Sequence, residues 1–242
     1  MTGNSLILVP GAQHGGWCWR KMLEPLRTRG YDVHAITLTG LGERAHLLTP
    51  EVDLTTHITD VVALIEAEEL TGVTLVGHSY GGMVVAGAAA RLRHPAVRRL
   101  VYLDSPVPVD GDSIISAHPA GHLVPDGRTV IDGVAVLPVH DASALGVHGD
   151  DLVWVQRRLT PHPYASVTTP LHLPDGWNDR IEQVYVRCVT GPDDEPVPYL
   201  SRVDESAGWR LFELHSGHDA MIDAPDALVA LLDQLCAFPL SR

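Results

Sequence analysis

Residues 75–82 read LVGHSYGG, with Ser79 two residues from a glycine on either side and an apolar run before it. Glycine-x-serine-x-glycine between a strand and a helix is typical of a sharp turn that tolerates no bulky neighbours. Such a turn pushes the serine hydroxyl out at the carboxyl edge of a sheet and aims the N–H of Tyr80 at the same point. We predict that Ser79 is a nucleophile. The alternative is a tight turn in which serine is merely small.

The residues around this motif alternate between strand and helix patterns. Short, nearly continuous apolar runs predict strands at 5–11, 31–38, 73–79, 97–105, 181–189 and 209–217. Apolar residues at helical spacing predict helices at 17–30, 56–70, 80–93 and 223–238. This order indicates an α/β fold, a mostly parallel sheet with helices on both faces. Active sites of such sheets lie at the carboxyl ends of the strands.

Residues 106–180 break the alternation and are rich in proline, glycine and histidine. Because a structureless loop of this length is uncommon, we predict a small inserted cap, partly helical over 142–159. The core is then formed by 1–105 and 181–242. Trp154 and other apolar residues of the cap predict an apolar wall for a substrate pocket.

A serine nucleophile needs a base, and His218 is the best candidate. It follows the late strand at 209–217, so it reaches the same edge of the sheet as Ser79, and Gly217 before it allows a close approach. His215 is a rival, but it falls within the strand pattern. Histidine pairs at metal-like spacing lack a third ligand at a sensible place, so we predict no metal site.

Acyl transfer also needs hydrogen-bond donors for a developing oxyanion. Residues 9–19, VPGAQHGGWCW, place a glycine-bearing turn after the first strand, beside the strand that carries the nucleophile. We predict that Gly11 belongs to the substrate-binding turn and that the N–H of Ala12 is the second donor beside Tyr80. The alternative for Pro10 and Gly11 alone is an ordinary β-turn.

Composition excludes several classes of function. The net charge of −13 disfavours nucleic acid as a partner. There is no apolar run long enough to span a membrane and no signal-peptide pattern at the start. The three cysteines form no C-x-x-C motif, which favours a reduced, cytoplasmic protein. Lys21 is the one lysine among 17 basic residues, a bias typical of GC-rich bacterial genomes. The oligomeric state stays open, a homodimer included.

The chain resembles the α/β-hydrolase family, and within it the plant methylesterase and hydroxynitrile lyase group with its bacterial esterase relatives. The matching stretches are PGAQHGGWCW (10–19), GHSYGG (77–82), LVYLDSPVP (100–108), RLTPHP (158–163) and GHDAM (217–221). The resemblance implies Ser79 as nucleophile, His218 as base, and Ala12 and Tyr80 as oxyanion donors. It also implies a cap over about 106–180 and no cofactor.

The acid of the triad is where the chain departs from this group. The group usually has its acid about three residues after the cysteine that ends the penultimate strand, and here that position is Gly191. Asp193 or Asp194 can serve if the loop doubles back, and the usual placement slightly favours them. Asp104, at the end of an earlier strand, is the other candidate, because some enzymes of this fold place the acid there. The alternative role for Asp104 is a turn or capping residue.

These residues favour a serine hydrolase that cleaves a carboxylic ester or lactone bearing apolar groups. A lyase of the hydroxynitrile type with the same triad is the runner-up. Such lyases differ from esterases one residue before the donor N–H and directly after the histidine. Here these positions are Gly11 and Asp219, which can neither orient nor protonate a cyanide leaving group. A non-catalytic binding protein is the third alternative, and an intact Ser79 and His218 pair argues against it.

Overall fold

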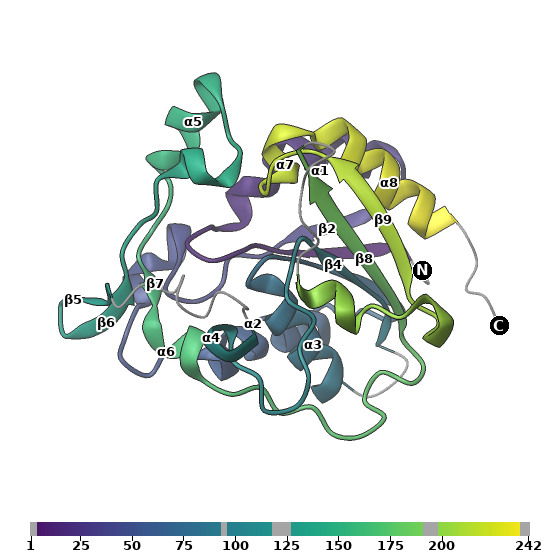
Figure 1. Cartoon of the computed structure of the whole chain (residues 1–242), viewed down its shortest axis with the longest axis horizontal. Helices are drawn as coiled ribbons and strands as arrows, with labels where there is room; N and C mark the ends of the chain where they lie inside the picture. Colours follow the sequence, from purple (N-terminus) through teal and green to yellow (C-terminus); the bar gives the residue numbers. More distant parts are fainter. Residues whose placement is uncertain (1–3, 93–95, 118–126, 191–197, 238–242) are drawn as a thin grey trace.

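The computed structural model describes residues 4–92, 96–117, 127–190 and 198–237 of the chain (Figure 1). A six-stranded sheet with the order β2-β1-β3-β4-β8-β9 forms its centre, and each neighbouring pair of strands is parallel. The strands are β1 (Ser5–Val9), β2 (Asp32–Ala35), β3 (Val73–His78), β4 (Val97–Leu103), β8 (Glu182–Val189) and β9 (Arg210–His215). The predicted α/β fold with a mostly parallel sheet is confirmed.

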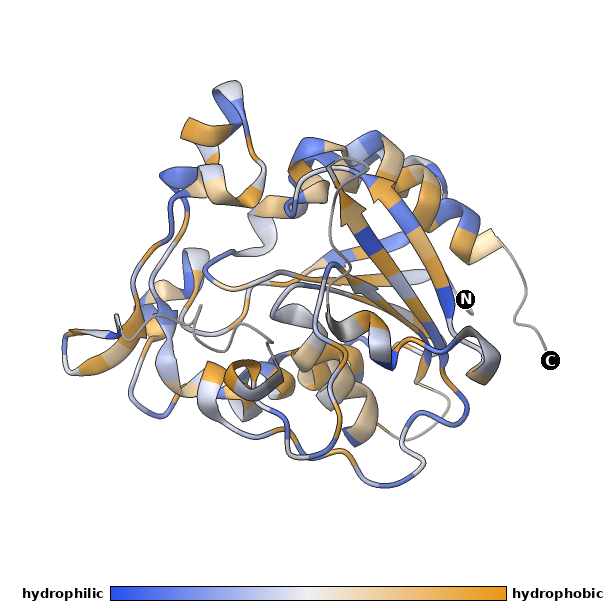
Figure 2. Ribbon diagram, viewed as in Figure 1, coloured by the Kyte–Doolittle hydropathy of each residue, from blue (hydrophilic) through white to orange (hydrophobic). Residues whose placement is uncertain are grey.

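Helices cover both faces of the sheet because successive side chains of a strand point to opposite faces. Leu6 and Leu8 of β1 pack with α1 (Arg20–Thr28) and α8 (Pro225–Ala237), whereas Ile7 and Val9 pack with α2 (Leu54–Ala67) and α3 (Gly81–Arg91). The central strands β3 and β4 are buried along almost their whole length, whereas hydrophobic and hydrophilic residues follow one another along β8 and β9 (Figure 2). The sheet is thus the centre of two apolar layers.

The helices begin and end near their predicted positions, with differences that have local causes. A capping box between Asp53 and Thr56 starts α2 two residues before the predicted helix. The predicted helix at 17–30 divides into a 3₁₀ turn, η1 (Gly16–Trp19), and α1. Shorter elements of the core are η2 (Gly42–Leu47), η5 (Pro198–Arg202), η6 (Glu205–Ala207) and α7 (Ala220–Asp223).

The segment between β4 and β8, where the sequence predicts a cap, carries its own small elements (Figure 1). They are α4 (Ile114–Ala117), β5 (Thr129–Ile131), β6 (Val134–Leu137), η4 (Ala142–Leu145), α5 (Gly149–Gln156), β7 (His162–Pro163) and α6 (Tyr164–Thr168). Strands β5, β6 and β7 form an antiparallel sheet apart from the central one. The stretch 142–159, predicted to be partly helical, contains η4 and α5, which are separated at Gly146, a residue with a φ of 74°.

In the four described ranges of the chain, no helix combines the length and the apolar character that crossing a membrane requires.

Candidate active site

Ser79 lies at the junction of β3 and α3 with a φ of 50°, a conformation that is strained for any residue with a side chain. Its backbone N–H donates to the carbonyl of Leu103, 3.0 Å away at the end of β4. A Cβ atom at Gly77 would lie 2.6 Å from the carbonyl oxygen of Gly81, and one at Gly81 would lie 2.7 Å from that of Val9. The two glycines therefore have the steric role that the sequence predicts.

His218 meets a carboxylate that comes from a different strand end. Its Nδ1 lies 2.6 Å from Oδ2 of Asp104, the residue that follows β4. The other carboxylate oxygen of Asp104 accepts the N–H of Cys188 at 3.3 Å. Because an ionised carboxylate only accepts, Nδ1 of His218 carries a proton and Nε2 is left free to accept one. This is the tautomer that a general base requires.

The surroundings of His218 change its basicity. Burial alone would lower its pKa, but the hydrogen bond that His218 donates to Asp104, the charge of Asp104 and the charge of Asp219 together outweigh burial. The pKa of His218 is therefore raised above its ordinary value. A histidine with this environment is a stronger base than one in water.

His78 and Gly11 show that three segments meet here: the turn at Ser79, the loop that carries His218, and the turn after β1 that carries Gly11. The ring of His78, directly before Ser79, lies 4.6 Å from that of His218, and its Nε2 donates to the His218 carbonyl at 2.9 Å. A Cβ at Gly11 would lie 3.0 Å from the Cβ of Ser79. In the described part of the chain, no hydrogen bond joins Ser79 Oγ to His218. Such contacts are often loose without substrate.

Burial, followed by the charge of His218, lowers the pKa of His78 to about 3. His78 is therefore neutral under all ordinary conditions and serves as a hydrogen-bond donor to the histidine loop rather than as a base.

The backbone N–H groups of Ala12 and Tyr80 have the properties of oxyanion donors. Among the residues that the structure describes, no hydrogen bond uses either group. The side chain of Tyr80 points elsewhere, because its hydroxyl lies 2.7 Å from Nδ1 of the buried His57. His57 Nε2 is 2.9 Å from the carbonyl of Thr39, so Nε2 donates and Nδ1 accepts the Tyr80 hydroxyl. Only the backbone of Tyr80 is then available to a substrate.

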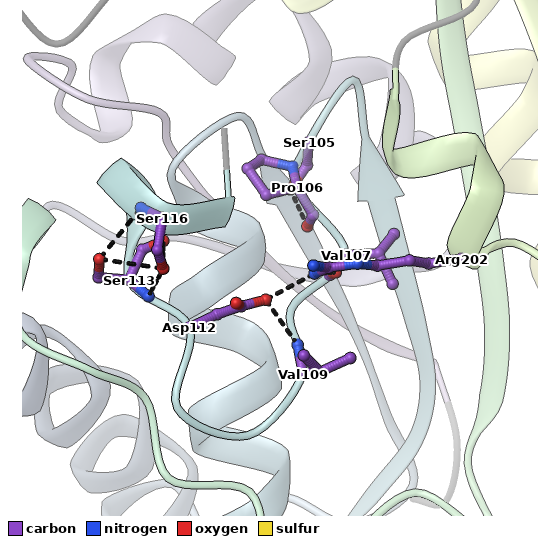
Figure 3. Close-up of polar contacts among 8 residues, drawn as sticks. All are labelled: Ser105, Pro106, Val107, Val109, Asp112, Ser113, Ser116 and Arg202. Carbon is purple, nitrogen blue, oxygen red and sulfur yellow. Dashed lines mark hydrogen bonds and ion pairs between the residues drawn. The ribbon is translucent and has the colours of Figure 1, made fainter. Parts of the chain in front are cut away.

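The chain that leaves Asp104 is fixed by a group that sequence reasoning missed. Arg202 donates to the carbonyl of Val107 at 2.7 Å and pairs with Asp112, which also accepts the N–H of Val109 (Figure 3). The segment after β4 is thereby tied to η5. No local pattern marks Arg202, because its partners Val107 and Asp112 lie 95 and 90 positions earlier in the chain.

Other predicted residues are less directly placed. The ring of Trp154 meets that of Trp17 edge-on with centroids 5.1 Å apart, and the guanidinium of Arg158 lies 4.7 Å from its centroid. Substrate contact by Trp154 stays a prediction. His215 is exposed at the end of β9. Asp193 and Asp194 lie outside the described residues.

Sequence reasoning also missed a buried pair beside the histidine. Asp219 directly follows His218 and is fully buried, and its Oδ2 lies 3.0 Å from Nε2 of His14. Within the described ranges, no group of three or more histidine, cysteine or carboxylate side chains is placed to hold a metal ion.

Two features together define the α/β-hydrolase class. One is a mostly parallel sheet with a strained serine between a strand and the following helix, and the other is a histidine that is hydrogen-bonded to a carboxylate at the end of a strand. The chain belongs to the alpha/beta hydrolase family, whose model matches residues 6–231. The predicted resemblance to plant methylesterases and their bacterial esterase relatives is confirmed, and the chain is an esterase-like hydrolase.

Three similar proteins illustrate this. The carbendazim hydrolyzing esterase of Nocardioides sp. (strain SG-4G) is 41% identical over 242 residues, 96% of this chain and 99% of that protein. Salicylic acid-binding protein 2 of Nicotiana tabacum is 37% identical over 84 residues, 34% of this chain and 32% of that protein. The structure of an extracellular α/β-hydrolase from a Paenibacillus species matches with a TM-score of 0.78 and 19% identity, over 95% of this chain and 98% of that one.

Proposed function

We propose that this protein is a serine hydrolase that cleaves a carboxylic ester or lactone through Ser79, His218 and Asp104. The observation that carries the proposal is the 2.6 Å contact between His218 Nδ1 and Asp104 Oδ2, next to the strained turn of Ser79. A serine on a strained turn is a poor nucleophile by itself, and a correctly oriented base supplies what it lacks. This choice places the acid at the end of β4 rather than in the loop of Asp193 and Asp194.

The proposed reaction has two halves. In the first, Nε2 of His218 takes the proton of Ser79 while Oγ attacks the ester carbonyl, and the N–H groups of Ala12 and Tyr80 bind the resulting oxyanion. His218 then gives the proton to the leaving alcohol, which leaves an acyl-enzyme. In the second half, His218 takes a proton from water, the hydroxide attacks the acyl group, and Ser79 regains its proton as the acid leaves.

The electrostatics of the site support this sequence. Asp104 holds the imidazole in the tautomer with a free Nε2 and stabilises the imidazolium that forms during attack. The raised pKa of His218 has the same cause, since burial is outweighed by the bond and charge of Asp104. Ser79 also lies two residues before α3, an eleven-residue helix whose N-terminus favours the developing negative charge.

The substrate class that we propose is a small ester with apolar groups, including carbamate esters. The full-length similarity to a protein described as a carbendazim hydrolyzing esterase supports the carbamate part, because carbendazim is a methyl carbamate on an aromatic ring. Trp17 and Trp154 stack edge-on close to the first turn and are suited to an aromatic group.

Elimination without net hydrolysis is the competing reaction for this triad. Asp219 occupies the position after the histidine, and it is buried and bonded to His14 rather than directed at a leaving group. Gly11 provides no side chain one residue before the donor N–H. Both features favour hydrolysis.

The test combines labelling with turnover. A fluorophosphonate probe should label wild-type protein at Ser79, as located by peptide mass spectrometry, and should not label Ser79→Ala. The p-nitrophenyl esters of increasing acyl length should release one acid and one alcohol per water consumed. Carbendazim should release methanol, the aromatic amine and carbon dioxide for each water consumed, because the carbamic acid that hydrolysis forms loses carbon dioxide. Absence of labelling at Ser79 in a folded protein would overturn the proposal. Turnover without water consumption would favour elimination.

A further inference from the structure

Gln13, directly after the proposed oxyanion donor Ala12, has an unusual backbone. Its φ is 68°, and its side chain is buried with 1% of the residue exposed. A residue with a side chain keeps this left-handed conformation only when its surroundings hold it there. The nearby contacts show what holds it.

Every polar group of Gln13 is bonded to the cap segment, 106–180. Its backbone N–H donates to Nδ1 of His162 at 3.1 Å, and its carbonyl accepts the N–H of Thr160 at 3.0 Å. Its side-chain Nε2 donates to the carbonyl of Pro138 at 2.8 Å, and its Oε1 accepts the N–H of His140 at 2.9 Å. One residue of the first turn is therefore the meeting point of two separate stretches of the cap.

The surroundings of His162 keep its Nδ1 available to accept the backbone N–H of Gln13. It is fully buried, and its Nε2 lies 2.9 Å from Oγ of Ser166. Since Nδ1 accepts the backbone N–H, the ring proton lies on Nε2 and is donated to Ser166. Burial lowers the pKa of His162 well below its ordinary value, so the ring stays neutral and Nδ1 stays an acceptor.

The opposite side of the same turn is held by His14. Its Nδ1 donates to the carbonyl of Ala12 at 2.8 Å, and its Nε2 faces Asp219 at 3.0 Å. The peptide between Ala12 and Gln13 is thus fixed at its oxygen by His14 and at its nitrogen by His162. The N–H of Ala12 is one residue away from this fixed peptide, and it directly follows Gly11, where an added Cβ would lie 3.0 Å from the Cβ of Ser79.

We propose that Gln13 is a positioning residue: it ties the turn that carries the Ala12 N–H to the cap segment and so keeps that N–H aimed at the oxyanion. This inference rests on the proposed function. Gln13 is buried and acts through Ala12, not through contact with substrate. The cap then has a catalytic consequence besides forming a pocket wall, because its docking sets the geometry of the donor.

The oxyanion forms only in the transition state, so the two kinetic constants should respond differently. Loss of one oxyanion donor costs about 10²–10³ in kcat, and misalignment should cost less than removal. Gln13→Met keeps the side-chain volume and removes both side-chain bonds. We expect kcat to fall by about 10–100-fold with little change in KM.

Gln156 offers a matched control within the cap. Its Oε1 accepts the N–H of Ala142 at 2.8 Å, and its Nε2 donates to the carbonyl of His140 at 3.1 Å. Gln156→Met therefore removes the same two kinds of bond, one of them to the same residue, without touching the first turn. We expect its kcat to stay within about threefold of wild type, since the donor keeps its position.

A pair of inhibitors distinguishes a misplaced Ala12 N–H from a general loosening of the substrate site. A trifluoromethyl ketone binds as a tetrahedral adduct with an oxyanion, whereas the matching methyl ketone binds as a ground-state analogue. In Gln13→Met the affinity for the trifluoromethyl ketone should fall by the same factor as kcat/KM, and that for the methyl ketone should not. A loss confined to KM, an equal loss in Gln156→Met, or an unchanged kcat would each overturn the inference.

Folding and the proposed function are checked separately. If thermal unfolding shows that Gln13→Met is unfolded, the same criteria apply to Gln13→Asn, which tolerates a positive φ but whose amide is one methylene too short to reach both Pro138 and His140. Ser79 labelling and hydrolysis by the wild-type protein test the proposed function. If these succeed while kcat of the Gln13 variant is normal, only the role of Gln13 fails.

Discussion

Replacement of Asp104 by asparagine tests the choice of triad acid. The exchange keeps the size of the side chain and removes its negative charge. The side chain has two contacts to satisfy: His218 Nδ1 at 2.6 Å and the N–H of Cys188 at 3.3 Å. A carboxylate accepts from both, but an amide has one acceptor and one donor end.

Either orientation of the amide fails at one contact. If its NH₂ faces His218, Nδ1 must accept, the ring proton moves to Nε2, and the histidine can no longer take the proton of Ser79. If its oxygen faces His218, the NH₂ opposes the N–H of Cys188. The first orientation blocks catalysis through the wrong tautomer, and the second places two donors 3.3 Å apart.

We expect kcat to fall by about 10³–10⁴, because the same exchange in serine proteases costs about 10⁴ through the wrong tautomer. At 1.36 kcal/mol per factor of ten, this is about 4–5.5 kcal/mol of transition-state stabilisation. The binding of substrate should change little, since Asp104 does not face it. The side-chain volume is unchanged, so the variant should remain folded.

The assay compares kcat on one p-nitrophenyl ester for Asp104→Asn, Asp193→Asn and Asp194→Asn, with circular dichroism to confirm folding. The two loop variants should keep rates close to wild type. A rate for Asp104→Asn within tenfold of wild type would refute the reasoning. A collapse confined to a loop variant would return the acid to the loop after β8, where the family usually has it.

Three further measurements follow from the site. Ser79→Ala should lower kcat by more than about a hundredfold with an unchanged melting temperature, because only a γ-oxygen at a turn is lost; substantial remaining turnover would exclude Ser79 as nucleophile. A general base must be unprotonated, and the pKa of His218 is raised, so kcat/KM should rise with pH through a midpoint above about 6.5. Asp104→Asn removes causes of that rise, so its midpoint should move to lower pH; a profile flat from about pH 5 to 9 in the wild type would contradict His218 as base. Gly82→Ala should lower the free energy of unfolding by about 1–3 kcal/mol in urea titrations, because its Cβ would overlap with Oγ of Ser105. Adding Ser105→Ala should recover part of that loss, and equal stability of the single variant and wild type would show that the backbone there can shift.

Local sequence determined the nucleophile turn. Ser79 has its strained backbone within the motif itself, and Gly77 is crowded by Gly81 of the same motif. Gly81 is crowded by the neighbouring first strand. The motif was therefore enough to predict the turn. The alternation of apolar runs and helical patterns likewise determined the parallel sheet. A strand buried on both faces has a nearly continuous apolar run, and a helix buried on one face has apolar residues at helical spacing. The exact start of α2 depended on a capping box at Asp53 that apolar spacing does not reveal.

Only the tertiary structure paired His218 with Asp104. The two residues are 114 positions apart, and their contact depends on β4 and β8 being neighbours in the sheet and on the positive φ of Asp104, 44°. The glycine at position 146, between the two helical segments of 142–159, has a similar tertiary reason, because the backbone of Gly217 approaches so closely that a Cβ at Gly146 would lie 2.6 Å from it. The partners of Gln13 are at least 125 positions away. Sequence periodicity describes which face of an element is buried, whereas these contacts depend on which elements the fold places side by side.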